Sequence, residues 1–371
     1  MNTSPDLERA LRATLQGLAD RNVVDGQLDA ILDHVARRRQ RPAWRATLSS
    51  LSMTATAIRF PQVAVRPAWK MLAVAGVILA LILATLLAVG GRRFGPPTNG
   101  RIVFGRWDPA QNGPVLYTVN PDGSHLLQLR PEAHACPYWS PDGALITTPG
   151  AVMNGDGTGY RVLPSPTGSL TIFCGVWSAD QKSIVAEAWN DTDPSQTGLW
   201  SLRSSDGGDL HQLTTTTNGG NDIPIGFAPD GSSIAFTRSV TPQGSPRLFL
   251  ADPDGTNARQ VGDIQVDCGD WAPDGRSILV ESAGRLYTVD IASGTATAIV
   301  IAASPDEFNL GNPAWSPDGT RILFTRQVDV AGGQTVANLF QMRADGTDVT
   351  QVTNGPVDDF PADWGTYPLV N

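Results

Sequence analysis

The stretch that decides the fold is Trp315-Ser316-Pro317-Asp318-Gly319-Thr320-Arg321-Ile322-Leu323-Phe324, because related copies recur through the last three-quarters of the chain. In each copy Pro-Asp-Gly favours a tight turn after the aromatic residue, and the apolar run then begins a new strand. The copies lie 38 to 50 residues apart, a spacing that fits one four-stranded propeller blade per repeat. They begin at Trp139, Trp177, Phe227, Trp271, Trp315 and Trp364.

A second series of turns has the same period and supports the repeat. One member falls in each repeat and follows a short apolar run: Asp122-Gly123, Asp156-Gly157, Asp206-Gly207, Asp254-Gly255, Ser293-Gly294 and Asp345-Gly346. We therefore predict six blades with strands A to D. The third strands are expected at 116–119, 151–153, 199–203, 248–251, 286–290 and 339–343.

The two ends of the repeat region complete each other. Its first strand, Arg101-Ile102-Val103-Phe104, corresponds to the strand after the Pro-Asp-Gly turn in later repeats, so the first blade lacks its own strand A. The last strand, at 360–364, is expected to enter the sheet made by residues 101–130 and close the ring. Such closure leaves no long free sheet edge. The predicted fold class is an all-β six-bladed propeller at 101–367, preceded by a membrane helix and a small α-helical segment.

Charge divides the 371-residue chain. Residues 1–97 carry 13 Lys and Arg against 6 Asp and Glu, whereas residues 98–371 carry 14 against 30. An acidic propeller repels phosphate backbones, so nucleic acid is not an expected partner.

The N-terminal region has the pattern of a membrane anchor. Residues 1–41 are predicted to be a helical cytoplasmic segment and 42–70 a juxtamembrane linker. The uncharged stretch 71–89 is long enough for a transmembrane helix, and 90–100 is a second linker. Because 70 residues precede the apolar stretch, we expect an uncleaved anchor and not a signal peptide.

Membrane orientation follows from the basic residues before the span. Residues 11–70 hold ten Lys and Arg, which places the N-terminus in the cytoplasm and the propeller outside it, at the cell membrane. The N-terminal helices either pack on each other or take a cytoplasmic protein partner. Small residues at every fourth position of the span suit a dimer: Gly76, Ala80, Ala84 and Ala88.

The propeller is expected to have two unlike ends. The A–B and C–D turns are short and lie at one end, whereas the B–C and D–A loops vary in length at the other. Variable loops often carry function, although their polar residues are also commonly just solvated. The candidate binding residues at this loop end are Trp107, Asp108, Trp189, Asn190, Asp191, Asp222, Asp306, Glu307, Phe308, Asp358 and Asp359.

The repeats resemble those of TolB-like proteins, also called PD40 or WD40-like β-propeller repeats. The resemblance rests on the Trp-Ser-Pro-Asp-Gly-x-x-Ile-x-Phe copies and on strands such as Leu210-His211-Gln212-Leu213-Thr214, and it covers residues 101–364. It implies six blades. The copies at Trp177 and Trp364 are interpreted as having lost the turn, and the helical segment and anchor replace the domain that precedes the propeller in TolB, so the Tol–Pal role is not carried over.

Catalytic and metal motifs are not evident in the sequence. There is no Gly-x-Ser-x-Gly motif, and the three propeller histidines fall in different repeats, so we expect no cofactor and no metal site. Each of the three cysteines, Cys136, Cys174 and Cys268, lies three residues before an anchor aromatic. They are either small buried side chains or, for Cys136 and Cys174, a bridge between adjacent blades.

Two classes of function remain. The first is a non-enzymatic single-pass membrane protein whose propeller binds an envelope protein or an extracytoplasmic ligand, with an anti-sigma-like signalling protein as a variant of the same layout. The second is a hydrolase or lyase that uses carboxylates such as Asp222, Asp358 and Asp359, with or without a divalent ion.

Overall fold

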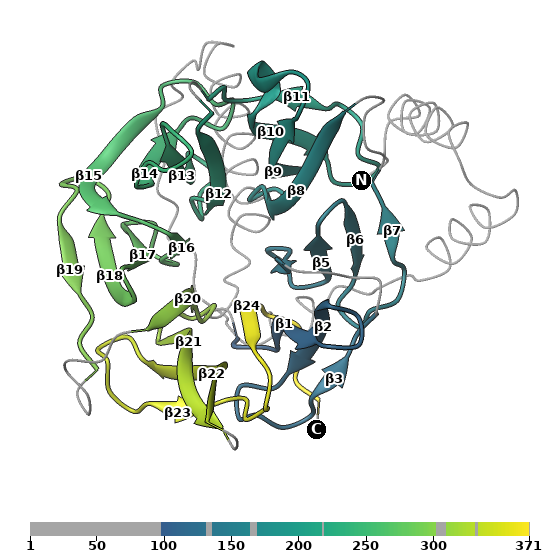
Figure 1. The fold of residues 1–371 in the computed structure, drawn as a ribbon, viewed down its shortest axis with the longest axis vertical. Helices are drawn as coiled ribbons and strands as arrows, with labels where there is room; N and C mark the ends of the chain where they lie inside the picture. The colour runs from purple at the N-terminus through teal and green to yellow at the C-terminus, as the bar shows by residue number, and fades with distance from the viewer. Residues whose placement is uncertain are drawn as a thin grey trace, which may run out of the picture. The chain divides into compact units, whose positions relative to one another are not determined.

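The computed structural model describes residues 98–130, 136–163, 169–216, 219–301, 309–330 and 333–370. These residues form a six-bladed propeller in which every blade is a four-stranded antiparallel sheet, as Figure 1 shows. The predicted helical segment, membrane span and dimer-forming small residues lie outside the described residues. In the part of the chain that is described, no helix combines the length and apolar character needed to cross a bilayer.

The first three blades follow the sequence repeat, except that blade 1 takes its innermost strand from the far end of the chain. Blade 1 consists of β24 (Asp359–Trp364), β1 (Ile102–Asp108), β2 (Gly113–Val119) and β3 (Leu127–Gln128). Blade 2 consists of β4 (Tyr138–Trp139), β5 (Leu145–Thr148), β6 (Ala151–Asn154) and β7 (Arg161–Val162). Blade 3 consists of β8 (Leu170–Trp177), β9 (Ser183–Asn190), β10 (Gly198–Arg203) and β11 (His211–Gln212), with the short 3-10 helix η2 (Pro194–Gln196) between β9 and β10.

The other three blades are each continuous in sequence. Blade 4 consists of β12 (Asn221–Phe227), β13 (Ile234–Ser239), β14 (Arg247–Ala251) and β15 (Arg259–Gln265). Blade 5 consists of β16 (Cys268–Trp271), β17 (Ser277–Ser282), β18 (Arg285–Asp290) and β19 (Ala296–Ala298). Blade 6 consists of β20 (Leu310–Trp315), β21 (Arg321–Val330), β22 (Gln334–Arg343) and β23 (Thr350–Gln351).

The predicted ring closure is confirmed. Strand β24 pairs antiparallel with β1, with Ile102 opposite Trp364 and Arg106 opposite Asp359. Beyond β24 the chain continues alongside residues 100–101, because the Arg101 N–H donates to the Tyr367 carbonyl oxygen at 2.9 Å. The end of the propeller is thus tied to its beginning, as the blue and yellow strands of Figure 1 show.

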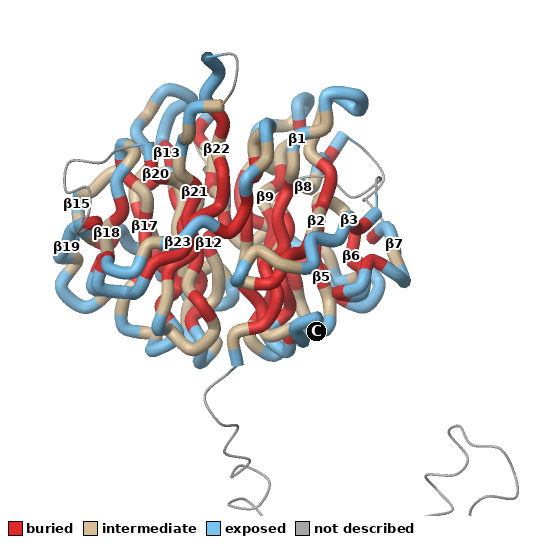
Figure 2. The backbone as a smooth tube through the Cα atoms, turned by 90° about the horizontal axis from the view of Figure 1, so that it is seen from below, coloured by how far each residue is buried: buried red, intermediate tan, exposed pale blue. Residues whose placement is uncertain are grey.

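The core is divided among the blade interfaces. Six hydrophobic clusters occur in the described residues, and each joins two neighbouring blades. Alternation along a strand explains the arrangement, because successive side chains point to opposite faces of a blade. Ile102 therefore packs toward blade 6, whereas Val103 packs toward blade 2. Figure 2 shows the result, with buried strand segments and exposed connections at both ends.

The tight turn is formed after five of the six anchor aromatics, with one correction to the prediction. In the copy at Trp177, the interpretation that the turn is lost was wrong. The Gln181 N–H donates to the Ser178 carbonyl oxygen at 2.9 Å, and Gln181 adopts the positive φ of 62° that glycine has in the other copies. The copy at Trp364 does lack the turn.

Blade 4 has phenylalanine where the other inner strands end in tryptophan. Trp177 and Trp271 each donate an indole hydrogen bond to the backbone of the preceding blade, at Tyr138 and Gly226. Phe227 has no such donor, and it lines a cavity of about 380 Å³ between blades 3 and 4.

Phe227→Trp is therefore expected to raise the free energy of unfolding by about 1 kcal/mol, through filled space and a hydrogen bond to the Val176 carbonyl oxygen. Urea unfolding of both proteins measures the change, with Phe227→Leu as the variant expected to lose stability. A tryptophan variant less stable than the wild type would show that the space cannot accept the larger ring.

Adjacent blades 2 and 3 are also joined covalently. The structure has a disulfide between Cys136 and Cys174, whose Cα atoms are 5.5 Å apart, and Cys268 is a free thiol. Of the two alternatives drawn from the sequence, the bridge is thus the one present.

Loss of this disulfide is expected to destabilise the propeller. The bridge closes a 38-residue separation, for which chain entropy gives a stabilisation of about 4 kcal/mol. Cys136→Ser should lower the melting temperature and make it insensitive to reductant, while Cys268→Ser should keep the reductant response. Equal melting temperatures for Cys136→Ser and the oxidised wild type would contradict the expectation.

Candidate functional site

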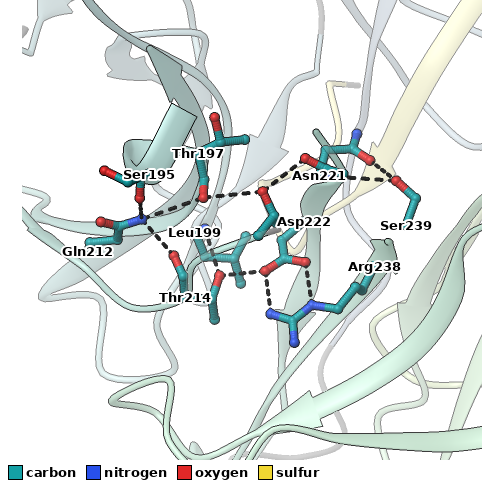
Figure 3. Close-up of polar contacts among 11 residues, drawn as sticks. Ser195, Thr197, Leu199, Gln212, Thr214, Asn221, Asp222, Arg238 and Ser239 are labelled. Carbon is teal, nitrogen blue, oxygen red and sulfur yellow. Dashed lines mark hydrogen bonds and ion pairs between the residues drawn. The ribbon is translucent and has the colours of Figure 1, made fainter. Parts of the chain in front are cut away.

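The predicted loop-end residue Asp222 is buried in an ion pair. Its exposed fraction is 0%, and the Arg238 guanidinium donates to both carboxylate oxygens, at 2.7 Å and 2.6 Å. The Thr214 hydroxyl donates to the same carboxylate at 2.6 Å and accepts the Leu199 N–H. Figure 3 shows this network between blades 3 and 4. Both carboxylate oxygens of Asp222 therefore accept hydrogen bonds from partners within the fold.

Asp359 repeats the arrangement at the closure of the ring. It is fully buried, and Arg106 donates to its two oxygens at 2.6 Å and 2.7 Å. In both pairs the guanidinium also lies over aromatic rings, as Arg106 does over Phe104 and Tyr117. Such Asp–Arg pairs hold strand A against strand B and are not open to a ligand.

Three other predicted residues lie close to this closure. Trp107 has 36% of its surface exposed, and its N–H donates to the Asp358 carbonyl oxygen at 2.8 Å. The Asp358 carboxylate accepts the Ala337 N–H at 2.8 Å and so joins β22 to the last connection. Asp108 accepts hydrogen bonds from Ala110 and Gln111 within its own turn.

The predicted residues of blade 3 lie together at the end of β9 and at the start of the loop that follows it. Asn190 is buried, and its side-chain oxygen accepts the N–H groups of Thr192 and Asp193. Trp189 meets Phe173 edge-on, with ring centroids 5.9 Å apart, and Asp191 is exposed. Trp189 and Asp191 remain candidates for contact with a ligand.

The loop-end residues do not form a metal centre within the described ranges, where no group of three His, Cys, Asp or Glu side chains is placed to hold an ion. Asp306, Glu307 and Phe308 lie outside the described residues. The structure therefore brings Trp107, Asp108, Asp358 and Asp359 together at the closure of the ring and leaves the other described candidates on blades 3 and 4.

A cavity of about 270 Å³ lies at the opposite end of the propeller, where the inner strands of four blades end. We call it the turn-end cavity. Its lining consists of Trp139, Ser140, Pro141, Asp270, Trp271, Pro273, Trp315, Ser316, Pro317, Asp363, Trp364, Gly365 and Thr366.

Two carboxylates in this lining connect neighbouring blades. Asp363 on β24 accepts the Trp139 N–H of blade 2 at 2.6 Å and the Trp364 N–H at 2.8 Å. Asp270 on β16 accepts the Trp315 N–H of blade 6 at 2.7 Å. The inner strands have backbone N–H groups without a strand partner, and these two side chains accept three of them, those of Trp139, Trp315 and Trp364.

The two carboxylates are held in an environment that disfavours their charge. Burial and the neighbouring charge of Asp363 raise the pKa of Asp270 to about 7. Burial raises the pKa of Asp363 to about 6, although the hydrogen bonds from the backbone of Trp139 and Trp364 act in the opposite direction. Strongly shifted groups inside a cavity are a recognised mark of functional sites.

The carboxylates lie between the turn-end cavity and a smaller cavity of about 40 Å³ further along the channel, because both cavities include Asp270 and Asp363. The smaller cavity is also lined by Tyr138, Cys268 and Asn312. Burial raises the pKa of the Tyr138 hydroxyl, and burial together with Glu281 raises the pKa of the Cys268 thiol to about 12. Both side chains are neutral at ordinary pH.

The candidate residues chosen from the sequence did not include Asp270 or Asp363, but the repeat contained a signal for them. Each directly precedes an anchor tryptophan, whereas the other anchors are preceded by Tyr138, Val176, Gly226 and Ala314. Aligned repeats thus show two acids at one position that faces the channel. The candidate residues were all taken from the variable loops, whereas these two acids lie at the end where the A–B turns are.

Comparisons with known proteins agree with the fold. No protein-family model matches the chain. An uncharacterised protein of Agrobacterium fabrum strain C58 is 26% identical over 147 residues, which make up 38% of this chain and 46% of the relative, so the match spans less than half of the relative's length.

Solved structures with a similar fold include TolB proteins. TolB from Acinetobacter baumannii has a TM-score of 0.56 at 18% identity, covering 73% of this chain and 68% of that one. A structure assigned to TolB from Agrobacterium tumefaciens has a TM-score of 0.50 at 18% identity, covering 74% of this chain and 94% of that one. At these identities the likeness shows the propeller fold alone.

Proposed function

We propose that the chain is a single-pass membrane protein whose extracytoplasmic TolB-like propeller is a non-enzymatic module that binds a protein or a small ligand. The observation that carries the proposal is the turn-end cavity, in which Asp270 and Asp363 lie at the mouth of a closed ring. A closed propeller is a stiff support for such a site, because each blade is packed on two neighbours. Concave sites with a few convergent polar groups are the usual form of ligand pockets.

Two observations support the location. The apolar, uncharged stretch 71–89 suits a span, and the basic residues before it favour a cytoplasmic N-terminus. The Cys136–Cys174 disulfide suits an oxidising compartment, since disulfides persist outside the cytosol.

Location is tested by thiol labelling of intact cells with a membrane-impermeant maleimide. In a Cys268→Ser background, Asp191→Cys provides an exposed thiol on the propeller and Ser4→Cys one near the N-terminus. We expect Asp191→Cys to react in intact cells and Ser4→Cys only after lysis. The reverse pattern would refute the orientation, and labelling of neither before lysis would refute an extracytoplasmic propeller.

Partner binding is tested by affinity capture from detergent extracts with three baits: the full chain, the chain without residues 1–65, and an Asp270→Asn, Asp363→Asn double variant. Envelope proteins held by the first two baits and lost by the third support a binding site at the turn-end cavity. A sigma factor held only when residues 1–65 are present would favour the signalling variant. Identical recovery by all three baits would argue against both.

The unequal carboxylates favour one second candidate, a hydrolase or lyase. A carboxyl group with a pKa of about 7 beside one of about 6 is suited to general acid and general base roles. In that case Asp270 is the acid and Asp363 the base. If the wild type turns over a substrate, and both Asp270→Asn and Asp363→Asn lose this activity to the same extent, the enzyme alternative would replace the binding proposal.

A further inference from the structure

The cavity beside Phe227 lies between blades 3 and 4 and shares no lining residue with the turn-end cavity. Five inner strands end in tryptophan, and here the smaller phenyl ring leaves a space of about 380 Å³. We call it the Phe227 cavity. Its lining consists of Ser178, Ala179, Asp180, Ser183, Ser201, Phe227, Asp230, Gly231 and Pro253. This volume lies near the lower end of the range for ligand pockets, which suits a molecule built on one or two rings.

A buried hydroxyl in the wall of this cavity has no partner. Ser201 is 7% exposed, and its hydroxyl makes no hydrogen bond with any described residue. Because side chains alternate along a strand, Ser201 shares a face of β10 with Leu199, which packs toward blade 4. The described residues contain five unpaired side-chain atoms that are sealed from solvent, and the Ser201 hydroxyl is not one of them, so it stays accessible from the cavity. A buried polar group of this kind favours a ligand that supplies the missing hydrogen bond.

Two charged acceptors lie at the rim of the Phe227 cavity. Asp180 and Asp230 are exposed residues of the A–B turns of blades 3 and 4. Hydrogen bonds from the Lys182 N–H and the Ser178 hydroxyl lower the pKa of Asp180. Hydrogen bonds from Ser232 lower the pKa of Asp230 in the same way. Both side chains are therefore carboxylates at neutral pH, and they accept hydrogen bonds without donating any.

The chemistry of the lining favours an uncharged ligand with hydroxyl groups. No lysine, arginine or histidine lines the cavity, so the two carboxylates repel an anion. A cationic ligand gains little, because both carboxylates are exposed to water and Asp180 already lies 3.2 Å from Lys182 Nζ. Hydroxyl groups can donate to the carboxylates and can bond to Ser201 in either direction. Phe227 and Pro253 add apolar surface for the C–H groups of a ring.

We propose that the Phe227 cavity binds a neutral sugar in its pyranose form. The C–H face of the ring packs against Phe227, and one hydroxyl bonds to Ser201. Other hydroxyls donate to Asp180 and Asp230 at the rim. This site lies on a different pair of blades from Asp270 and Asp363, so the inference goes beyond the proposed function and is tested separately from it.

The test is saturation-transfer NMR of the full chain in a detergent without a sugar headgroup. The probes are the methyl pyranosides of glucose, galactose and mannose, each compared with its uronic acid and its 2-amino sugar. We expect at least one neutral pyranoside to bind with a Kd on the order of 1 mM, and its uronic acid to bind at least about tenfold more weakly. No binding of any neutral pyranoside at about 10 mM would overturn the inference. Tighter binding of either charged relative would overturn it as well.

Matched variants separate binding from folding. Phe227→Trp, which is expected to stabilise the propeller, fills the cavity and should abolish binding. Ser201→Ala should weaken binding by about tenfold, because it removes one hydrogen bond. Asp230→Ala should also weaken binding, whereas Asp274→Ala, which removes the aspartate from the same place in the A–B turn of blade 5, should not. Unchanged binding in Phe227→Trp or in Ser201→Ala would overturn the inference.

Discussion

Asp270→Asn is expected to raise the free energy of unfolding at pH 8 by on the order of 2–4 kcal/mol. Asp270 is kept in the channel beside Asp363, and burial together with that neighbour raises its pKa to about 7. Asparagine keeps an oxygen that can accept the Trp315 N–H, and it carries no charge to repel Asp363. The substitution removes a charge from the interior and is therefore expected to stabilise the protein.

The pH dependence has a definite sign. A carboxyl group whose pKa is raised in the folded state binds more protons there than in the unfolded chain, so stability is lost as pH rises from about 4 through about 7. Turn aspartates such as Asp254 and Asp345 have the opposite shift, because hydrogen bonds from Thr256 and Thr347 lower their pKa. Their stabilisation is lost below about pH 4. Wild-type stability should therefore be greatest at about pH 4, above the range in which the turn aspartates take up protons and below the range in which Asp270 loses its proton.

Urea unfolding at pH 5 and pH 8 measures this effect. The wild type should be less stable at pH 8 than at pH 5, and Asp270→Asn should remove most of the difference. Asp191→Asn, which removes an equal charge from an exposed loop, is the control and should leave the difference in place. A wild type that gains stability from pH 5 to pH 8 would contradict the expectation.

Asp222→Ala is expected to lower the free energy of unfolding by about 3–5 kcal/mol, because it leaves the Arg238 guanidinium without its partner in the interior. The same change also removes the acceptor of the Thr214 hydroxyl. The loss should appear as a lower urea midpoint with an unchanged slope.

Two comparisons make this prediction specific. Asp191→Ala removes a carboxylate from an exposed loop and should change the free energy of unfolding by no more than about 0.5 kcal/mol. The double variant Asp222→Ala, Arg238→Met should recover part of the loss, since no buried charge remains. A loss below about 1 kcal/mol for Asp222→Ala would mean that the ion pair does not hold β12 against β13.

The fold was predictable because its information is local and repeated. Each Pro-Asp-Gly turn fixes where strand A ends and strand B begins, and six copies at one period leave few alternatives. The missing strand in blade 1 and the extra strand at the end predicted closure, and β24 pairs with β1 accordingly. The turn at Gln181 was missed because a non-glycine residue takes the positive φ there.

The candidate site was less predictable, because burial and pairing depend on contacts that are distant in sequence. Asp222 and Asp359 read as loop acids, but their arginine partners lie 16 and 253 residues away. Asp270 and Asp363 each read as one strand residue among many. Their common place before an anchor tryptophan is visible in the aligned repeats, but their closeness to each other appears only when the ring brings two blades from separate parts of the chain to one axis.

The most direct test of the central claim is a carboxyl NMR titration of the full chain in detergent with labelled aspartate, assigned through Asp270→Asn and Asp363→Asn. The claim is that two carboxyl groups, Asp270 and Asp363, lie close to each other at the mouth of the channel, in surroundings that disfavour their charged form. We expect two resonances to titrate near pH 7 and pH 6, and the Asp270 resonance to move toward a lower pH in Asp363→Asn, where the neighbouring charge is removed. Aspartates that all titrate below about pH 4.5, near the ordinary value, would contradict it.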